Sequence, residues 1–154
     1  MILKVTPVID YNVRTLCTTP YPGHKYGCPN YNKKEGCPPK APKFEEIFNM
    51  DGFFYAIINR YNLRKHVLEM RLKHPGWTQR QLRNLLYWQP TARKQLLTKI
   101  RDFHREHRGF HITACPEALG VNVTLTLANA GYNLEWPPEH IACQIAIAGL
   151  KGEP

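Results

Sequence analysis

The chain has 154 residues, near the common size of one domain, and its 43% of hydrophobic residues suffice for a packed core. The formal net charge of +9 favours an anionic partner. No run approaches the roughly 20 apolar residues of a membrane span, and the opening residues MILKVTPVIDYNV lack the basic and apolar regions of a secretory signal. We therefore predict one domain over residues 1–154, in the cytoplasm and without a membrane partner.

In chain order, the pattern predicts strands that alternate with helices. The expected elements of the first part are a strand at 2–8, an extended piece at 13–16, a loop at 17–42, a short helix at 43–50 and a strand at 53–58. The last of these strands, Phe53 to Ile58, is continuously apolar, which is typical of a strand covered on both faces.

The second part begins with a helical stretch at residues 60–108. Its apolar spacing predicts three helices: one ends near Pro75, one opens with Thr78 and Gln81 in a capping-box pattern, and one has Pro90 in its first turn. A strand at 110–114, a helix at 116–130 and a strand at 141–148 complete the chain. We predict an α/β fold, a single layered domain with a small sheet, packed helices, a Cys/Pro-rich loop and the basic helical stretch as an insertion.

The loop at residues 17–42 holds three of the five cysteines and six of the thirteen prolines. No apolar period of 2 or 3.6 runs through it, which argues against a buried strand or an amphipathic helix. So long a stretch is unusual in a compact domain unless it is functional or disordered, and cysteines and tyrosines are not typical of disorder. Prolines directly after Cys28 and Cys37 stiffen the chain there. We predict that Cys17, Cys28 and Cys37 converge on a metal.

The cysteine usage also indicates the kind of metal site. Cysteines in a chain without a secretory signal favour metal binding or redox chemistry over disulfides. Ligation by thiolates alone suits zinc or an iron–sulfur cluster, and Cys115 would complete either one as the fourth ligand. With three cysteines, a [4Fe–4S] cluster would leave one iron open to bind substrate as a Lewis acid. We favour [4Fe–4S] over zinc, although the spacing of the loop cysteines is by itself a weak signal.

The remaining thiols have competing interpretations. Cys115 precedes Pro116 between a predicted strand and a predicted helix, where a helix N-terminus would lower the thiol pKa and make it a nucleophile. We rate this below a role as a ligand or a buried thiol. Cys143 lies in an apolar run, where a free cysteine packs as a small hydrophobe.

Two parts of the chain share motifs with other proteins. The loop contains Cys28-Pro29-Asn30-Tyr31 and then Cys37-Pro38-Pro39, and Cys17 precedes both; the tail contains related stretches at 116–121, 129–131 and 135–138. In these parts the sequence resembles a family of uncharacterised prokaryotic proteins described as predicted metal-binding. The resemblance implies a metal cofactor and a fold but no reaction, and it does not cover the basic helical stretch. Family members often carry further cysteines before the tail helix, where this chain has only Cys115, so the fourth ligand stays open.

Residues 60–108 hold thirteen lysines and arginines against three acidic residues, with aromatic residues interleaved. A basic surface with aromatics suits phosphate contact and base stacking, although a solvated helical face would have the same composition. The candidate nucleic-acid-binding residues are Trp77, Arg80, Arg83, Trp88, Arg93 and Lys94. Two hypotheses follow: an iron–sulfur protein that uses its cluster on an anionic or nucleic-acid (RNA or DNA) substrate, and a nucleic-acid-binding module whose cysteines hold a structural zinc.

Overall fold

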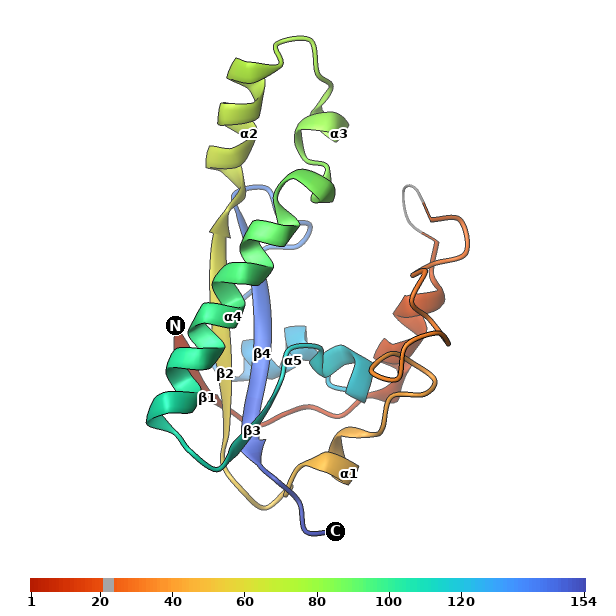
Figure 1. Ribbon diagram of the computed structural model, residues 1–154, viewed down its shortest axis with the longest axis vertical. Helices are drawn as coiled ribbons and strands as arrows, with labels where there is room; N and C mark the ends of the chain where they lie inside the picture. The colour runs from red at the N-terminus through yellow and green to blue at the C-terminus, as the bar shows by residue number, and fades with distance from the viewer. Residues whose placement is uncertain (21–23) are drawn as a thin grey trace.

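The computed structural model describes residues 1–20 and 24–154, so Tyr21, Pro22 and Gly23 of the predicted metal-binding loop lie outside the described residues. Four antiparallel strands form one sheet in the order β1-β2-β4-β3 (Figure 1). Their bounds are β1 Ile2–Val5, β2 Phe54–Asn62, β3 Phe110–Thr113 and β4 Ile141–Leu150. The predicted small α/β domain, with helices packed on a small sheet, is confirmed.

Eight helical elements surround the sheet within the described residues. Writing η for a 3₁₀ helix, they are η1 Tyr11–Thr18, α1 Phe44–Ile47, α2 Leu63–Lys73, α3 Gln79–Leu82, η2 Leu85–Tyr87, α4 Gln89–Glu106, η3 Pro116–Leu119 and α5 Val123–Asn129. Of the helices in this described part of the chain, none combines the length and the apolar character that a bilayer crossing demands.

The central strands β2 and β4 pair along their whole length and are buried on both faces. One face carries Phe54, Ala56, Ile58, Ile145 and Ile147, which form a core with α1, η3 and α5. The opposite face carries Ile57, Ala146 and Ala148, which pack against Leu96 and Phe103 of α4. Each fully buried large apolar side chain contributes roughly 1.5–3 kcal/mol by leaving water. The continuous apolar run in β2 is thereby explained as a strand covered on both faces.

The basic helical stretch begins where β2 ends. Asn62 closes the strand and caps α2, because its side-chain oxygen accepts a hydrogen bond from Lys65 N at 2.9 Å. The predicted capping box of Thr78 and Gln81 opens α3, and Pro90 lies in the first turn of α4, as predicted. In Figure 1, α2 and α3 extend past one end of the sheet, while α4 runs back along it.

Three boundaries differ from the sequence-based expectations. Residues 13–16 lie in η1 and not in an extended piece, because Asp10 caps a helical turn by accepting from Asn12 N at 3.0 Å. Residues 60–62 belong to β2 and not to the helical stretch. The helix predicted at 116–130 is divided into η3 and α5 at Gly120, whose φ of +97° is left-handed, and a Cβ there would lie 2.4 Å from a ring carbon of Tyr11.

A carboxylate holds the turn that leads into β4. Glu135 accepts hydrogen bonds from Ile141 N at 3.0 Å, from the His140 ring at 2.6 Å and from His140 N at 3.0 Å. These donors, with the Ile141 amide contributing most, lower the pKa of Glu135 to about 2. Its charge therefore favours the folded state above the ordinary pKa of 4.5, and this contribution is lost as the pH falls towards 2.

We expect Glu135→Gln to lower the melting temperature at pH 7, with the deficit narrowing as the pH falls below about 4.5. Thermal melts of both proteins across pH 3–7 measure this difference. Glu139→Gln is the matched control, because Glu139 forms no ion pair among the described residues. A deficit that stays constant over the whole pH range would mean that the carboxylate charge does not stabilise this turn.

Candidate metal centre

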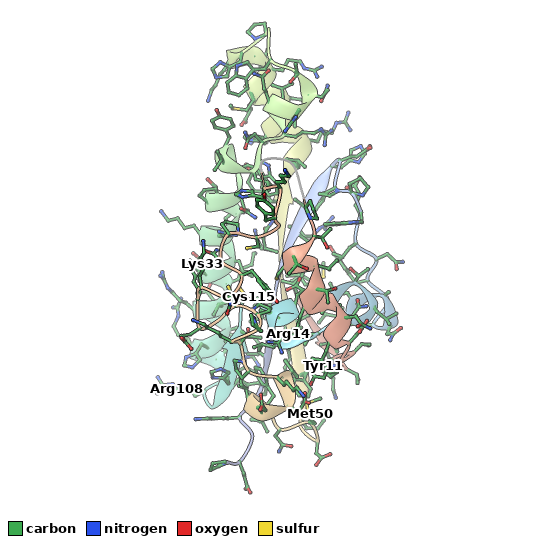
Figure 2. The ribbon with its side chains drawn as sticks, turned by 90° about the vertical axis from the view of Figure 1, so that its right-hand side faces the viewer. Tyr11, Arg14, Lys33, Met50, Arg108 and Cys115 are labelled. Atoms are coloured by element: carbon green, nitrogen blue, oxygen red, sulfur yellow. The ribbon has the colours of Figure 1, made fainter. Side chains whose placement is uncertain are left out.

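The four candidate ligand cysteines come from three separate segments. Cys17 lies near the end of η1, Cys28 and Cys37 lie in the loop that follows, and Cys115 comes two residues after β3. Figure 2 faces this side of the molecule and shows Cys115 in the area between the loop residue Lys33 and Arg14 of η1. The fold, and not closeness in sequence, therefore sets how these thiols approach one another.

Backbone contacts fix η1 against the segment that follows Cys115. Asp10 N donates to Gly120 O at 2.8 Å, and Asn122 N donates to Val8 O at 2.8 Å. An isolated β-bridge joins Ile9 and Val121 between these two bonds. The chain that enters η1 is thereby tied to the chain that leaves η3, and the end of η1 that carries Cys17 is held on the side of the molecule where Cys115 lies.

The loop returns to η1 through a short backbone contact. Cys28 N donates to Cys17 O at 2.7 Å. The preceding residue, Gly27, is buried, has a φ of +84°, and leaves so little room that a Cβ would stand 2.4 Å from Cys17 O. Only glycine adopts this left-handed conformation beside another backbone without strain. Gly27 therefore allows the first two loop cysteines to approach each other.

Arg14 holds the other end of the loop. Its guanidinium group donates to Pro39 O at 3.2 Å and to Ala41 O at 2.7 Å. Within the loop, Asn32 N donates to Pro38 O at 2.7 Å, while Ala41 N donates to Cys37 O at 2.9 Å. Ala41 is buried in the core that includes α1. The segment around Cys37 is thus anchored both to η1 and to the main core.

The pKa values of two of the four candidate thiols, Cys17 and Cys115, are raised. The pKa of Cys17 is raised by desolvation and, beyond that, by the charges of Cys28 and Cys37, while Arg14 acts in the opposite direction. The pKa of Cys115 is raised by desolvation, by Glu117 and by Cys37, and Arg93 opposes the shift. The expectation that a helix N-terminus lowers the pKa of Cys115 is therefore wrong: the following 3₁₀ helix is only four residues long, and desolvation dominates.

The distances between ligand atoms bear on which metal would fit. Among the described residues, one set of three or more His, Cys, Asp or Glu has its ligand atoms within 4.8 Å of one another, namely Glu135, Glu139 and His140. The cysteine sulfurs do not form such a set. One zinc ion binds thiolates at about 2.3 Å, which places tetrahedral ligands roughly 3.8 Å apart. A [4Fe–4S] cluster takes one thiolate per iron and needs wider spacing. The donor set, thiols alone, is chemically suited to either group.

The Glu135, Glu139 and His140 set carries no metal assignment. Glu135 already accepts three hydrogen bonds at the turn before β4.

Cys143 takes no part in the candidate centre either. It packs against the main core, with its Sγ 3.6 Å from the Tyr132 hydroxyl oxygen.

The candidate nucleic-acid-binding residues have different surroundings. Arg80, Arg93 and Lys94 are exposed, whereas Arg83 is half-buried and donates to Pro138 O at 3.3 Å. Trp88 is only 5% exposed, stacks on Tyr61 with ring centroids 5.2 Å apart, and donates to Arg83 O. Base stacking by Trp88 would require the core that it forms with Leu63, Val67 and Leu82 to open. Trp77 is half-buried and stacks on His74 at 3.9 Å.

Sequence reasoning missed two groups beside the cysteines. Arg14 interacts with Cys17 and holds the loop, and its position three residues before Cys17 was its only signal. Glu117 acts on both Cys17 and Cys115, and desolvation raises its own pKa although the residue keeps contact with solvent. The sequence alone does not show that this carboxyl group lies beside two of the thiols.

Comparison with known proteins gives no relatives: no family model matches the chain, and neither the curated proteins nor the solved structures contain a significant match. The resemblance to predicted metal-binding proteins therefore stays a prediction that rests on its motif residues.

Proposed function

We propose that this chain is an iron–sulfur protein that holds a [4Fe–4S] cluster on Cys17, Cys28 and Cys37, with Cys115 as the candidate fourth ligand. The observation that supports this best is geometric: Cys28 N donates to Cys17 O at 2.7 Å, and Arg14 of η1 holds the segment after Cys37 by donating to Pro39 O and Ala41 O. Thiolates are the preferred ligands of iron–sulfur clusters.

The surroundings of the thiols favour an anionic substrate. Arg14 of η1 counteracts the raised pKa of Cys17, and Arg93 of α4 counteracts that of Cys115. Their positive charge would stabilise thiolate ligands and attract an anion to the same place. If only Cys17, Cys28 and Cys37 hold the cluster, it would supply an open iron that could act as a Lewis acid. The basic stretch 60–108 then serves to bind the substrate, for which we propose a nucleic acid or another phosphate-bearing molecule.

The cytoplasm remains the compartment that we propose. The five cysteines form no disulfide, and unpaired thiols persist in a reducing environment.

The deciding experiment is an absorption spectrum of protein purified without oxygen, with iron, sulfide and zinc assayed on the same sample. We expect a broad shoulder near about 400 nm and about four irons and four sulfides per chain. About one zinc per chain in a colourless sample would instead support the nucleic-acid-binding module with a structural zinc. Protein that takes up neither metal, even after anaerobic incubation with iron and sulfide, would overturn the proposal of a metal centre.

A further inference from the structure

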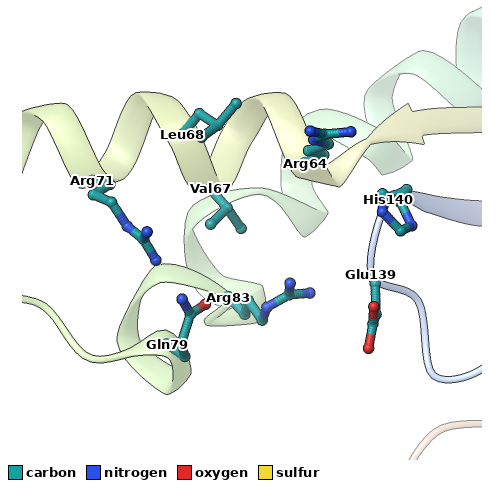
Figure 3. A pocket seen from close by; sticks show the side chains of 8 residues that line it. All are labelled: Arg64, Val67, Leu68, Arg71, Gln79, Arg83, Glu139 and His140. Carbon is teal, nitrogen blue, oxygen red and sulfur yellow. The ribbon is translucent and has the colours of Figure 1, made fainter.

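A surface pocket of about 280 Å³ lies between α2, α3 and the turn before β4 (Figure 3). Its lining residues are Arg64, Val67, Leu68, Arg71, Gln79, Arg83, Glu139 and His140. The four residues from α2 are spaced i, i+3, i+4 and i+7, so that they share one face of the helix. The helix thus presents two arginines and an apolar strip towards the same space.

The three arginines of this pocket have no carboxylate partner. Among the described residues, the ion pairs are Lys65 with Glu69, Arg105 with Asp102, and His140 with Glu135. Glu139 lines the pocket but lies beyond ion-pair distance of any arginine, and Figure 3 shows its carboxylate pointing away from α2. Three guanidinium groups around one space repel one another unless an anion lies between them.

The framework of the pocket is fixed before any ligand binds. Arg64 N donates to His140 O at 3.1 Å, which ties the start of α2 to the turn before β4. Arg83 is held by its bond to Pro138 O, and Val67 is buried at the base. Arg83 still has further N–H donors, because a guanidinium group carries five. A ligand would meet oriented donors and would order little of the protein on binding.

We propose that this pocket binds the phosphate group of a nucleotide or of a nucleic-acid backbone. Arginine forks match phosphate oxygens in paired hydrogen bonds, and a tetrahedral phosphate presents oxygens in several directions at once. A carboxylate has two oxygens in one plane and suits three guanidinium groups less well, since two come from α2 and the third from Arg83 at the end of α3. Leu68, which is 53% exposed, adds apolar surface for the adjoining sugar or base. The proposal rests on the part of the proposed function that assigns substrate binding to the basic stretch 60–108, and it does not depend on a metal.

The test is a binding titration of the full-length protein with a nucleoside 5′-monophosphate and with a short single-stranded oligonucleotide, at fixed ionic strength. We expect Arg71→Ala to weaken binding about tenfold or more, because it removes a charged donor that can make paired hydrogen bonds to the phosphate. Arg71→Lys keeps the charge and loses the fork, so its affinity should be intermediate. Lys151→Ala is the control, since it removes one exposed positive charge that lies outside both the pocket and the basic stretch 60–108.

The two ligands separate the two sources of phosphate. If Arg71→Ala binds the mononucleotide about tenfold more weakly, the pocket is assigned to a free nucleotide. If Arg71→Ala weakens binding of the oligonucleotide alone, the pocket is assigned to a nucleic-acid backbone. Equal losses in Arg71→Ala and Lys151→Ala would reduce the effect to overall charge and overturn the proposal, as would the absence of binding to either ligand. Arg64→Ala repeats the test if Arg71→Ala fails to fold. All outcomes are readable in protein without iron, so failure of the metal proposal and failure of this one remain distinct.

Discussion

Alanine in place of Cys17, Cys28 or Cys37 should remove the iron–sulfur absorption and most of the bound iron from anaerobically purified protein. Each proposed ligand binds a separate iron, so the loss of one thiolate leaves that iron without its protein ligand. We expect the sheet to persist in these variants, because the core of β2 and β4 is built without the three side chains. Iron assay, visible absorption and far-ultraviolet circular dichroism on the same samples measure the two effects separately.

Cys143→Ala is the matched control for this series. Cys143 is also a free, half-buried thiol, but it packs against the core beside Tyr132. Its replacement should leave iron and sulfide unchanged. Absorption that survives all three loop replacements would place the metal elsewhere and contradict the proposed ligand set.

Cys115→Ala decides between three and four ligands. The fourth-ligand hypothesis expects the same loss of iron as the loop variants. Retention of the iron with altered absorption or reactivity would instead support a cluster with one open iron. Cys115 interacts with Cys37 through the same electrostatic effect that links the loop thiols, which makes it the appropriate fourth residue to test.

The fold was predictable from sequence wherever local rules and burial agreed. The apolar run 53–58, the capping box of Thr78 and Gln81, and Pro90 in the first turn of α4 each have a local cause that the structure retains. The division of the tail helix was missed because a distant contact decided it. Gly120 divides the tail helix because it packs against Tyr11, more than a hundred residues earlier in the chain. Such a contact leaves no periodic signal in sequence.

The candidate site was predictable in its donors but not in its surroundings. Cysteines in a Pro/Gly-rich loop indicate a metal whatever the fold, because thiolate chemistry is local. The roles of Arg14 and Arg93 depend on how η1 and α4 are placed beside the thiols, which only the folded chain determines. For Trp88 the sequence suggested the wrong surroundings. Its aromatic ring suited base stacking, but the ring is buried against Tyr61 and the core of Leu63, Val67 and Leu82.

A single methyl group on Gly27 should weaken metal retention without touching any thiol. In Gly27→Ala, the new Cβ would lie 2.4 Å from Cys17 O and 2.7 Å from Thr18 C, both backbone atoms that cannot rotate away. The left-handed φ of +84° adds roughly 1–2 kcal/mol of strain for a residue with a Cβ. The loop must then move, which breaks the 2.7 Å bond between Cys28 N and Cys17 O and separates the two cysteines.

We expect loss of iron to a chelator to become about tenfold more favourable in Gly27→Ala, since about 1.4 kcal/mol corresponds to that factor. Gly36→Ala is the control in the same loop, because a Cβ at Gly36 meets nothing within 4 Å. The iron retention of Gly36→Ala should equal that of the unmodified chain. Both variants should keep the far-ultraviolet spectrum of the unmodified chain. If Gly27→Ala holds iron as firmly as Gly36→Ala does, then the close approach of Cys17 and Cys28 is not what positions the metal ligands, and Cys17 would be the first residue to remove from the proposed set.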